Sequence, residues 1–386
     1  METPTVSFLV PCYKLAHFLA ECVNSILSQS YKNIEIIILD DQSPDDTANI
    51  SQAIVSAHPD RNIIYVRNPE NLGNIRNYNK GIRMAAGKHV WILSPDDRLR
   101  SQNIVEKYVR LMESDPEVGY IFCPAHHIEN GQDRGIEQES VYRTNDQILN
   151  SHQLVKDIVD NNFYLLAPSV MIRKKCYEEI TLFPEDMPFR GDSYVWSLIA
   201  MQCKVGYFAE AMIDYRVHDN SMTSTLMREN AARAMEDDIA VPWRVKAEAE
   251  RRNLVDVVNH CWNAVTRIYI CSVLGTTRYR GYSYRLTFEG LESSLSKYEA
   301  NLMMRSMIRA RVLTAFGDYL FWGNRIREAR EMYQQANTSY RNVTTLTKLT
   351  LLRSGKLGVL LRGYIGRFSQ LSRKLIRIPL DFIHVK

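Results

Sequence analysis

The 386-residue sequence has no apolar run of the ~20 residues that a membrane-spanning helix requires. Its seven cysteines are an odd number, widely scattered and without a C-x-x-C pair, a pattern that excludes a disulfide framework and a zinc site. The 48 Lys and Arg against 44 Asp and Glu leave a net charge of +4, which is too small to indicate general nucleic-acid binding. These absences predict a globular protein of a reducing compartment with no nucleic-acid partner.

The hydrophobic and charged fractions, 45% and 24%, are those of an ordinary globular protein, so fibrous and disordered classes are excluded. The first apolar run, from Val6 to Val10, is shorter than a signal-peptide core and has no basic leader before it. A cytoplasmic location is therefore expected. At roughly 150 residues per domain, the length predicts two units or one large unit with an extension.

The first hundred residues alternate short β-branched runs with segments of helical periodicity. Four runs predict strands, at residues 6–10, 34–39, 63–66 and 90–93. Apolar residues at three-and-four spacing predict helices between them, over 15–27, 45–54 and 74–86. Nearly continuous apolar strands that alternate with helices are typical of a mostly parallel sheet covered on both faces. The predicted fold class is therefore α/β.

Acidic pairs follow two of the predicted strands. Asp40 and Asp41 come directly after the second strand, and Asp96 and Asp97 come shortly after the fourth. The carboxyl ends of parallel strands meet at one edge of a sheet, which is where ligands bind in such folds. Adjacent carboxylates repel each other unless a cation or a hydrogen-bonding group compensates. These pairs predict a site for a cation or for a hydroxyl-rich ligand.

The chain changes character near residue 226, where long helical patterns replace the strand candidates. We therefore expect three parts, namely residues 1–225, a helical region over 226–350 and a tail over 351–386. One stretch of the helical region has the spacing of a single tetratricopeptide unit, but no adjacent copy follows. A helical hairpin is the preferred interpretation, because such repeats are stable only in series.

The tail carries the local basic surface of the sequence. Its apolar residues step by four and three, and Lys and Arg accompany them with no acidic residue before Asp381. This pattern predicts either an interfacial helix attracted to anionic lipid or a terminal helix packed on its own domain. A peripheral membrane contact and a homo-oligomer are both expectations for the second half of the chain.

Ordered motifs across the first 225 residues resemble those of the family 2 glycosyltransferases. They are Val6-Ser-Phe-Leu-Val-Pro-Cys-Tyr13, Glu35-Ile-Ile-Ile-Leu-Asp-Asp-Gln-Ser-Pro-Asp-Asp-Thr47, Glu70-Asn-Leu-Gly73 with Asn79-Lys-Gly81 and Ala86-Gly87, Ser94-Pro-Asp-Asp97, Gly191-Asp192, and Tyr215-Arg-Val-His218 with Ser221. The resemblance implies a GT-A fold, which is Rossmann-like, with a nucleotide-sugar-binding catalytic domain in residues 1–225. It also implies an inverting reaction.

The resemblance assigns the nucleoside of the donor to the ends of the first two strands. Asp41 is expected to accept from the base imide, while Tyr13 and Pro11 flank the ring. Asp96 is expected to reach the ribose or a metal-bound water, and Arg76 is expected to reach the diphosphate. The alternative for the first acidic turn is a pair of capping carboxylates, and the alternative for Arg76 is a solvated helical face.

The pyrophosphate of a nucleotide sugar needs positive charge, which a divalent cation on oxygen ligands supplies. Asp97 is the expected metal ligand, and His218 is the second metal or phosphate contact that the resemblance implies. The cation is expected to be Mn²⁺ or Mg²⁺, and an imidazole ligand favours Mn²⁺. Ser94 stands where the family more often has an acidic residue, which speaks against a cluster of three carboxylates.

An acceptor hydroxyl must lose its proton as the new bond forms, so the transfer requires a base. The resemblance gives that role to Asp192, at the start of a helical pattern. The alternative for Asp192 is a helix cap, and at a helix N-terminus the dipole is expected to lower its pKa. Gly191 replaces the Glu that the family usually has beside this aspartate.

The sequence therefore predicts a metal-dependent glycosyltransferase that moves a sugar from a nucleoside diphosphate donor, most simply a UDP-sugar, to a hydroxyl acceptor. A lipid-linked glycan or surface polysaccharide precursor is the expected acceptor, at the cytoplasmic face of the inner membrane. A nucleotidyltransferase is a weaker alternative, because it needs a Gly-rich basic loop after the first strand and residues 11–14 contain no glycine. Ser94 and Gly191 keep open a non-catalytic GT-A-like scaffold with a helical interaction or membrane-docking region.

Overall fold

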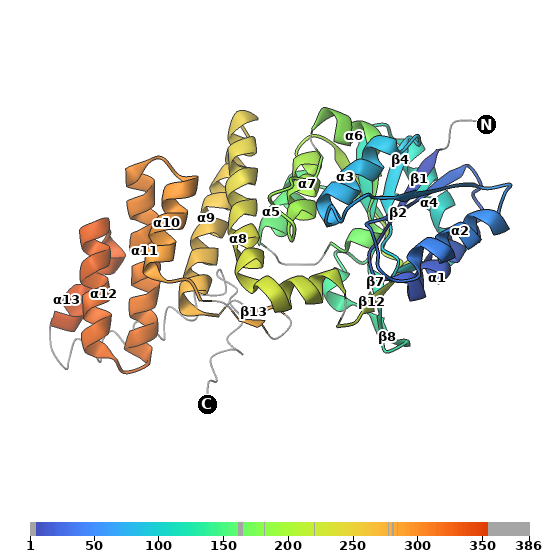
Figure 1. Ribbon diagram of the computed structural model, residues 1–386. Helices are drawn as coiled ribbons and strands as arrows, with labels where there is room; N and C mark the ends of the chain where they lie inside the picture. Colours follow the sequence, from blue (N-terminus) through green and yellow to red (C-terminus); the bar gives the residue numbers. More distant parts are fainter. Residues whose placement is uncertain are drawn as a thin grey trace. The chain divides into compact units, whose positions relative to one another are not determined.

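The computed structural model divides into two compact units, Met1–Cys261 and Trp262–Lys386 (Figure 1). The residues that the structure describes are 5–160, 165–180, 182–219, 221–276, 278–279, 282–283 and 285–353. The first unit reaches beyond the predicted boundary at residue 225, because the long helix that starts at Met222 packs with it. Since compactness does not define where catalysis ends, the catalytic domain over 1–225 stays a prediction.

Within the described residues, the main sheet of the first unit has eight strands in the order β3-β2-β1-β4-β10-β6-β11-β9. These strands are β1 Val6–Cys12, β2 Ile34–Asp40, β3 Asn62–Arg67, β4 His89–Ile92, β6 Val118–Phe122, β9 Gln147–Leu149, β10 Met171–Arg173 and β11 Lys204–Tyr207. β1 to β4 pair in parallel, whereas β10 lies antiparallel between β4 and β6. The predicted parallel sheet is confirmed for β1 to β4, and antiparallel pairs complete a mixed sheet.

A smaller sheet joins β5, β12, β7 and β8 in that order. Its strands are β5 Arg98–Leu99, β7 Ala125–Glu129, β8 Gln132–Ile136 and β12 Ile213–Val217. β12 pairs in parallel with β7 and antiparallel with β5. Because β5 follows Asp97 directly, this pairing brings the residues of β12 beside the second acidic pair.

Helices of the first unit flank these sheets, and α8 packs against α5 and α7 (Figure 1). They are α1 Ala16–Leu27, α2 Thr47–Ala57, α3 Asn74–Met84, α4 Ile104–Ser114, α5 Ser151–Asp160, α6 Lys174–Glu179, α7 Gly191–Ala200 and α8 Met222–Arg251, with 3-10 turns at Gln138–Ser140 and Ala167–Ser169. α1, α2 and α3 confirm the three predicted helices. Gly73 precedes α3 with a φ of +79°, a backbone conformation that L side chains rarely adopt. α8 bends at Asn230, where the backbone is not helical.

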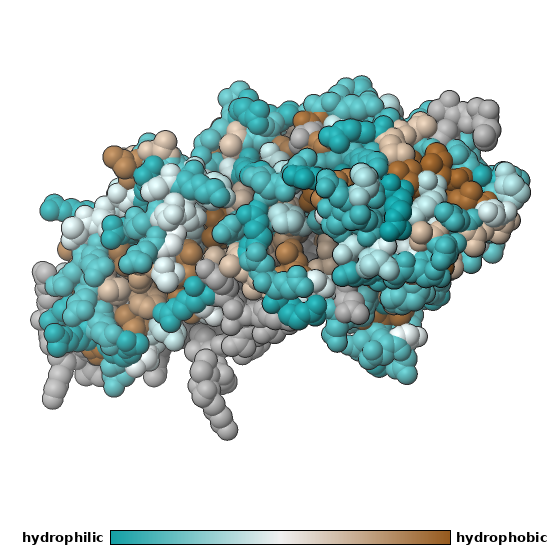
Figure 2. Space-filling view, viewed as in Figure 1, coloured by the Kyte–Doolittle hydropathy of each residue, from teal (hydrophilic) through white to brown (hydrophobic). Residues whose placement is uncertain are grey.

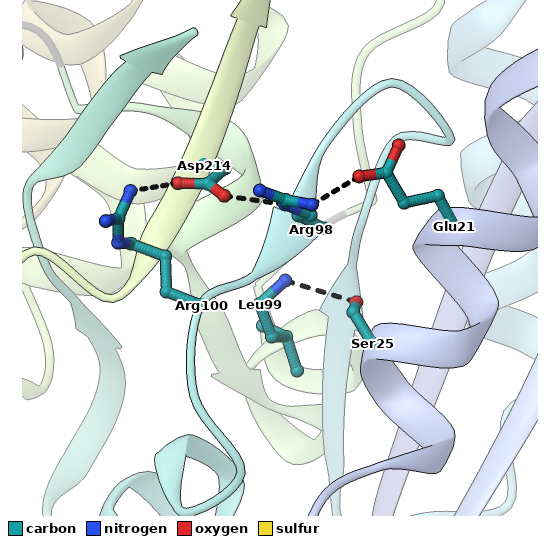
Figure 3. Close-up of a pocket in the computed structure, with 6 residues that line it drawn as sticks. All are labelled: Glu21, Ser25, Arg98, Leu99, Arg100 and Asp214. Atoms are coloured by element: carbon teal, nitrogen blue, oxygen red, sulfur yellow. Dashed lines mark hydrogen bonds and ion pairs between the residues drawn. The ribbon is translucent and has the colours of Figure 1, made fainter. Parts of the chain in front are cut away.

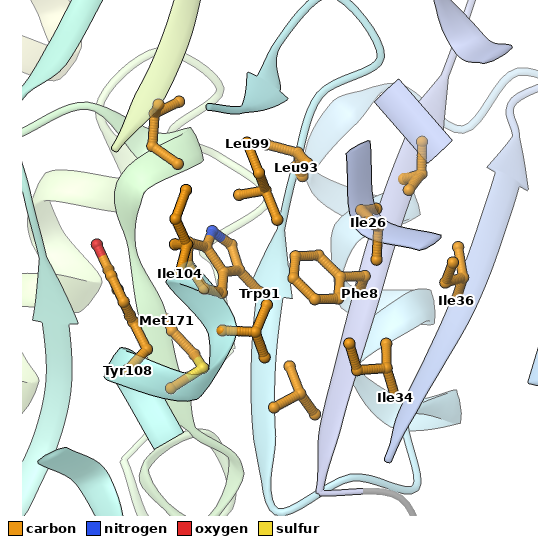
Figure 4. Packing of buried hydrophobic residues seen from close by; sticks show 14 of the residues in the cluster. Phe8, Ile26, Ile34, Ile36, Trp91, Leu93, Leu99, Ile104, Tyr108 and Met171 are labelled. Carbon is orange, nitrogen blue, oxygen red and sulfur yellow. The ribbon is translucent and has the colours of Figure 1, made fainter. Parts of the chain in front are cut away.

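Buried side chains cover both faces of the main sheet, and Figure 4 shows the cluster on the Phe8 face. Phe8 and Leu9 are neighbours on β1, point to opposite faces and are both fully buried. On one face, Trp91 stacks on Phe8 and on Tyr108, with ring centroids 5.2 and 4.4 Å apart. On the other face, a Cβ added to Gly81 of α3 would lie 3.0 Å from a Leu9 methyl group. Burial on both faces explains the continuous apolar strands of the sequence.

The second unit is mainly helical, which confirms the predicted helical C-terminal region. Its elements are α9 Val255–Leu274, which enters from the first unit, β13 Arg278–Tyr279, β14 Tyr282–Ser283, α10 Phe288–Tyr298, α11 Leu302–Trp322, α12 Ile326–Ser339 and α13 Val343–Arg353. α11 and α12 form a helical hairpin, in which Tyr333 packs on Gly317 and donates to Asp318 at 2.6 Å. Figure 2 shows brown, hydrophobic areas among teal ones over the C-terminal helices, and the exposed apolar residues of α11 include Leu302 and Trp322.

The predicted basic tail over 351–386 lies outside the described residues from residue 354 onward. Its first three residues form the end of α13. In the part of the chain that the structure describes, no helix combines the length and the apolar character needed to cross a bilayer. Membrane contact through the tail stays a prediction.

Candidate active site

The Asp96–Asp97 turn lies between β4 and β5, and the Asp97 N–H donates to the Ser94 carbonyl oxygen at 3.0 Å. Both aspartates are buried, with 7% and 3% of their surface exposed. β12 holds this turn through Arg216, whose backbone N–H donates to Asp97 Oδ1 at 3.0 Å and whose guanidinium donates to the Asp96 carbonyl oxygen at 2.8 Å. The predicted acidic pair is therefore fixed by a strand that comes 119 residues later in the chain.

The charges of this turn are incompletely compensated by the protein. Asp96 Oδ1 is buried and has no hydrogen-bond partner among the described residues. Burial and the neighbouring Asp96 charge raise the pKa of Asp97 well above its usual value, and the Arg216 N–H opposes this only in part. Two neighbouring buried carboxylates repel each other when both are ionised. A cation bound to the unpartnered oxygen would offset this repulsion.

His218 follows β12, and its Nε2 lies 3.0 Å from Asp96 Oδ2. Phe18 of α1 supports this end of β12, because its ring contacts the His218 ring at 5.3 Å and the Arg216 guanidinium at 4.4 Å. The sequence pattern assigns Phe18 to the apolar face of a helix and gives no sign of these contacts. His218 and Arg216, which hold the Asp96–Asp97 turn, thus both pack on a phenylalanine that the motifs do not include.

The donor atoms at this turn fit a divalent cation in kind. Carboxylate oxygens suit Mg²⁺ and Mn²⁺, and an imidazole nitrogen suits Mn²⁺. The open Asp96 Oδ1 and the raised pKa of Asp97 both mark a place that favours positive charge. His218 Nε2 contacts Asp96 Oδ2, and its role as a metal contact stays a prediction. Among the described residues, no three His, Cys, Asp or Glu side chains lie together as a metal cluster.

The first acidic pair is engaged by the protein itself. Asp41 accepts from the Asn68 amide at 2.8 Å and from the backbone N–H groups of Leu72 at 2.8 Å and Gly73 at 2.9 Å. Asp40 accepts from Ser43 N at 2.7 Å, Tyr65 Oη at 2.8 Å and Arg67 Nη1 at 2.9 Å. Since a carboxylate has about four acceptor positions, Asp41 keeps roughly one for a ligand. Its carboxylate holds the loop that leads into α3.

Tyr13 and Pro11 lie at the end of β1, where Pro11 is in register with Leu39 of the neighbouring β2. Tyr13 is 42% exposed, and the Lys14 ammonium lies 4.9 Å from its ring centroid. The predicted nucleoside residues Pro11, Tyr13 and Asp41 therefore occupy the ends of two adjacent parallel strands. The Tyr13 ring offers an exposed aromatic face at that edge.

Arg76 lies on the exposed side of α3 and forms an ion pair with Glu185 at 2.8 Å. More than half of each side chain is exposed, at 61% and 54%. Exposed pairs of this kind contribute at most about 1 kcal/mol to stability. The guanidinium is therefore occupied in the structure but weakly held.

Asp192 lies in the first turn of α7, and Arg190 holds the cap position of that helix. Its carboxylate accepts from the backbone N–H of Ser193 at 2.6 Å. Burial raises the pKa of Asp192, and the opposing effects of Arg190 and Ser193 do not cancel it. The expectation that the helix dipole lowers this pKa is wrong, because desolvation of the carboxylate dominates.

The Tyr78 hydroxyl of α3 is influenced by the charges of both the predicted base and the predicted metal pair. Burial raises the pKa of its hydroxyl, and so do the charges of Asp192, Asp96 and Asp97. All three carboxylates therefore lie within electrostatic reach of one side chain. The sequence motifs leave Tyr78 out, and the signal that points to it is its place directly before Asn79-Lys-Gly81.

A pocket of about 390 Å³ lies at the β5–β12 pairing (Figure 3). It is lined by Glu21, Ser25, Arg98, Leu99, Arg100 and Asp214. Its charged groups bind one another, since Arg98 donates to Asp214 at 2.6 Å and to Glu21, and Arg100 donates to Asp214. None of the predicted site residues belongs to this lining. These ion pairs therefore stabilise the pairing of β5 with β12, which positions the second acidic turn. They also engage the charged side chains of the pocket, so these side chains are not available to bind a ligand.

A family model and several curated proteins match this chain over part of its length. Residues 7–180 match the family model described as Glycosyl transferase family 2. An uncharacterized glycosyltransferase of Haemophilus influenzae is 28% identical over 235 residues, which cover 58% of this chain and 69% of that protein. Glycosyltransferase GlyG of Streptococcus pneumoniae is 26% identical over 229 residues, 57% of this chain and 73% of that protein. The minor teichoic acid biosynthesis protein GgaB of Bacillus subtilis is 27% identical over 56% of this chain and 23% of that protein.

Among solved structures, S. aureus TarS 1-349 in complex with UDP-GlcNAc aligns with a TM-score of 0.54 at 15% identity, over 92% of this chain and 89% of that chain. The same protein in complex with UDP aligns with a TM-score of 0.52 at 15% identity, over 91% of this chain and 92% of that chain. At this identity the likeness shows the fold. It confirms the predicted class, a GT-A-type α/β sheet with a helical C-terminal region.

Proposed function

We propose, on the premise that the chain belongs to glycosyl transferase family 2 through residues 7–180, that this glycosyltransferase moves a sugar from a UDP-sugar to a hydroxyl acceptor with inversion. The family match confirms the resemblance carried by the sequence motifs. The donor class is supported by the TarS structures, which contain UDP-GlcNAc and UDP. An acceptor on a surface polysaccharide precursor is supported by the likeness to a minor teichoic acid biosynthesis protein.

One observation carries the proposal, namely that the charges of Asp96, Asp97 and Asp192, from distant parts of the chain, all raise the pKa of the Tyr78 hydroxyl. Asp96 and Asp97 lie at the end of β4, and Asp192 lies in the first turn of α7. Burial raises the pKa of both Asp97 and Asp192. Perturbed carboxyl groups in one place are typical of a catalytic site.

Asp97 and Asp96 Oδ1 are the proposed ligands of a divalent cation, Mn²⁺ or Mg²⁺. When bound, such a cation supplies the positive charge that a leaving diphosphate needs. The Arg216 N–H occupies Asp97 Oδ1, which leaves Oδ2 for a ligand. His218 engages Asp96 Oδ2 and thereby orients the open Oδ1. The protein thus keeps one oxygen of each aspartate in place and one available.

The nucleoside is proposed to lie at the ends of β1 and β2, with its base on the exposed Tyr13 ring. Asp41 keeps about one acceptor position for the base imide while its other bonds hold the loop before α3. Pro11 shapes the strand end beside this aspartate. Arg76 is proposed to exchange Glu185 for the diphosphate, because a doubly charged ligand outcompetes one exposed carboxylate.

Asp192 is the proposed base. A carboxylate with a raised pKa is a stronger proton acceptor, and it matches the demands of general base catalysis better than an ordinary aspartate. The acceptor hydroxyl would donate its proton to the Asp192 carboxylate as its oxygen attacks the anomeric carbon. The bond from that carbon to the diphosphate oxygen would break, and UDP would leave. The Ser193 N–H holds the carboxylate oriented during this transfer.

The proposal is tested by measuring release of UDP from a panel of UDP-sugars, with the acceptor, in Mn²⁺ and in a chelator. We expect release that needs the metal and the acceptor, and we expect Asp192→Asn to bind UDP by calorimetry without transferring sugar. Asp60→Asn, which changes an exposed aspartate, is the matched control and should behave as wild type. Absence of UDP binding with and without Mn²⁺ would refute the proposal and favour the scaffold alternative.

A further inference from the structure

Cys176 and Cys203 lie side by side although they are 27 positions apart in the chain. Cys176 belongs to α6, Cys203 lies in the turn between α7 and β11, and their Sγ atoms are 3.9 Å apart. Both side chains lie over Gly119 of β6. Cys176 Sγ is 3.8 Å from the Gly119 carbonyl oxygen, and a Cβ built on Gly119 would lie 3.1 Å from Cys203 Sγ. The missing side chain at Gly119 therefore makes room for the two sulfur atoms.

Cys203 is the member of the pair that a small molecule can reach. It is partly exposed and lines a pocket of about 340 Å³, whereas Cys176 is buried. The other lining residues are Glu117, Asn150, Ser151, His152, Ala200, Met201, Gln202 and Lys204. A hydroperoxide is only slightly larger than water, which takes up about 30 Å³ in the liquid, so it fits this polar pocket.

The contact between the two thiols shifts their pKa values in opposite directions. The hydrogen bond with Cys176 lowers the pKa of the Cys203 thiol below its ordinary value, and Arg173 and Lys175 act in the same direction. The same hydrogen bond, together with burial, raises the pKa of Cys176. Cys203 is also the more exposed of the two, so its sulfur is assigned as the attacking thiol and that of Cys176 as the resolving thiol.

We propose that Cys176 and Cys203 are an oxidation site, at which a hydroperoxide converts the two thiols into an intramolecular disulfide. The Cys203 thiolate attacks a peroxide oxygen, so that an S–O bond forms, the O–O bond breaks and hydroxide or alkoxide leaves. The Cys176 sulfur then attacks the Cys203 sulfur, an S–S bond forms, and the departing hydroxide takes the Cys176 proton and leaves as water. The two thiols lose two electrons in total, and the peroxide accepts them.

The disulfide would join α6 to the turn that follows α7. It would close a loop of about 27 residues that contains all of α7. α7 has 10 residues, so its first turn, with Asp192, lies roughly 15 Å from the linkage. We therefore expect oxidation to raise the melting temperature of the protein, by roughly 5 °C, without occupying the candidate active site.

The experiment treats reduced full-length protein with hydrogen peroxide, counts free thiols and maps cross-linked peptides by mass spectrometry. We expect two of the seven thiols to be lost, with one cross-link between Cys176 and Cys203. We also expect a higher melting temperature, which dithiothreitol returns to the starting value. Retention of all seven thiols, or a cross-link between other cysteines, overturns the proposal.

Two serine variants separate the roles of the thiols. In Cys176→Ser, Cys203 should stop at sulfenic acid, which dimedone traps, whereas in Cys203→Ser Cys176 should stay unmodified. Cys271→Ser removes another partly exposed cysteine and should keep the cross-link. Dimedone labelling of Cys176 in the Cys203→Ser variant would contradict the assigned roles. The melting temperatures compare two redox forms of the wild-type protein, so the proposal remains testable even where a variant fails to fold.

Discussion

The two acidic pairs of the first unit both follow a strand of the main sheet but differ in how fully the protein hydrogen-bonds their carboxylates. Asp40 and Asp41 each accept three hydrogen bonds from the protein. Asp96, in contrast, keeps a buried oxygen without a partner among the described residues, beside Asp97 with its raised pKa. The hydrogen bonds of the first pair hold the fold, whereas the second pair keeps an oxygen without a partner among the described residues.

The origin of the donors explains the difference. The donors to Asp40 and Asp41 all come from residues 43–73, the segment that follows β2 and leads into α3. The main donor to the second pair is Arg216, from β12. The segment directly after β2 supplies donors to both carboxylates of the first pair. A single strand from later in the chain fixes the position of the second pair and leaves Asp96 Oδ1 without a partner among the described residues.

The largest expected effect is on the open pair. Asp97→Asn should lower UDP release by roughly 10³-fold or more, because several kcal/mol of charge stabilisation at the diphosphate depend on this carboxylate. Circular dichroism should show an unchanged fold. Steady-state rates for Asp97→Asn and for the exposed control Asp60→Asn check this, and equal rates would remove Asp97 from the mechanism.

Asp192→Asn is expected to lower the transfer rate by roughly 10²-fold or more, the usual contribution of a general base. UDP binding should not change, because Asp192 lies on α7 and not on the nucleoside edge. Since burial raises the pKa of Asp192, wild-type activity should be lost as the pH falls, at a pH above the usual titration range of an aspartate. A pH–rate profile with no acidic limb would contradict the role of base.

For the satisfied pair, the expected effect is on stability. Asp41→Asn should lower the free energy of unfolding by about 2 kcal/mol, since it weakens charge-assisted hydrogen bonds from Leu72 and Gly73 and turns an amide N–H₂ toward their N–H groups. Urea unfolding of the first unit measures this. If Asp96→Asn destabilises the protein equally, the two pairs do not differ as described.

Asp97→Asn should have the opposite effect on stability at neutral pH in the absence of divalent cations. The folded state holds the pKa of Asp97 above its usual 3.8, so wild-type stability falls as the pH rises from the unfolded value through the folded one. The advantage of the variant should therefore be absent well below pH 3.8 and complete above the raised pKa. Urea unfolding across pH checks this, and a pH-independent difference would contradict it.

The smallest expected effect concerns the exposed pair of Arg76 and Glu185. Arg76→Ala should change the free energy of unfolding by less than about 1 kcal/mol. Its KM for the donor should rise several-fold, because the proposed diphosphate contact is lost. Arg83→Ala, which changes another exposed arginine of α3, is the control. Equal KM values for the two variants would assign Arg76 to a solvated surface.

The order of elements in the first unit follows from the sequence, because burial gives each strand and helix a recognisable pattern of apolar residues. β1 and β2 are buried on both faces, so their runs of apolar residues identify them as strands of a covered sheet. Short strands such as β10 and β9 have three residues each and no comparable pattern. Their antiparallel pairing depends on tertiary neighbours, which is why the mixed sheet could not be predicted.

The candidate site divides in the same way. The acidic pairs, His218 and Asp192 are recognisable from motifs, because their residue types and order are local properties of the chain. Phe18 and Tyr78 are not, since each looks like one more residue of an amphipathic helix. The raised pKa of Asp192 could not be predicted from the sequence either, because desolvation depends on what the fold places around the carboxylate.

The sequence by itself determined the alternation of strands and helices, the acidic residues at the strand ends and the family motifs. Each of these is a property of a short stretch of chain. Only the tertiary structure decided which acidic pair stays open, which carboxyl groups have a raised pKa and which two of the seven cysteines touch. These properties depend on hydrogen bonds, burial and close approach between residues far apart in sequence. Such contacts exist only once the chain has folded.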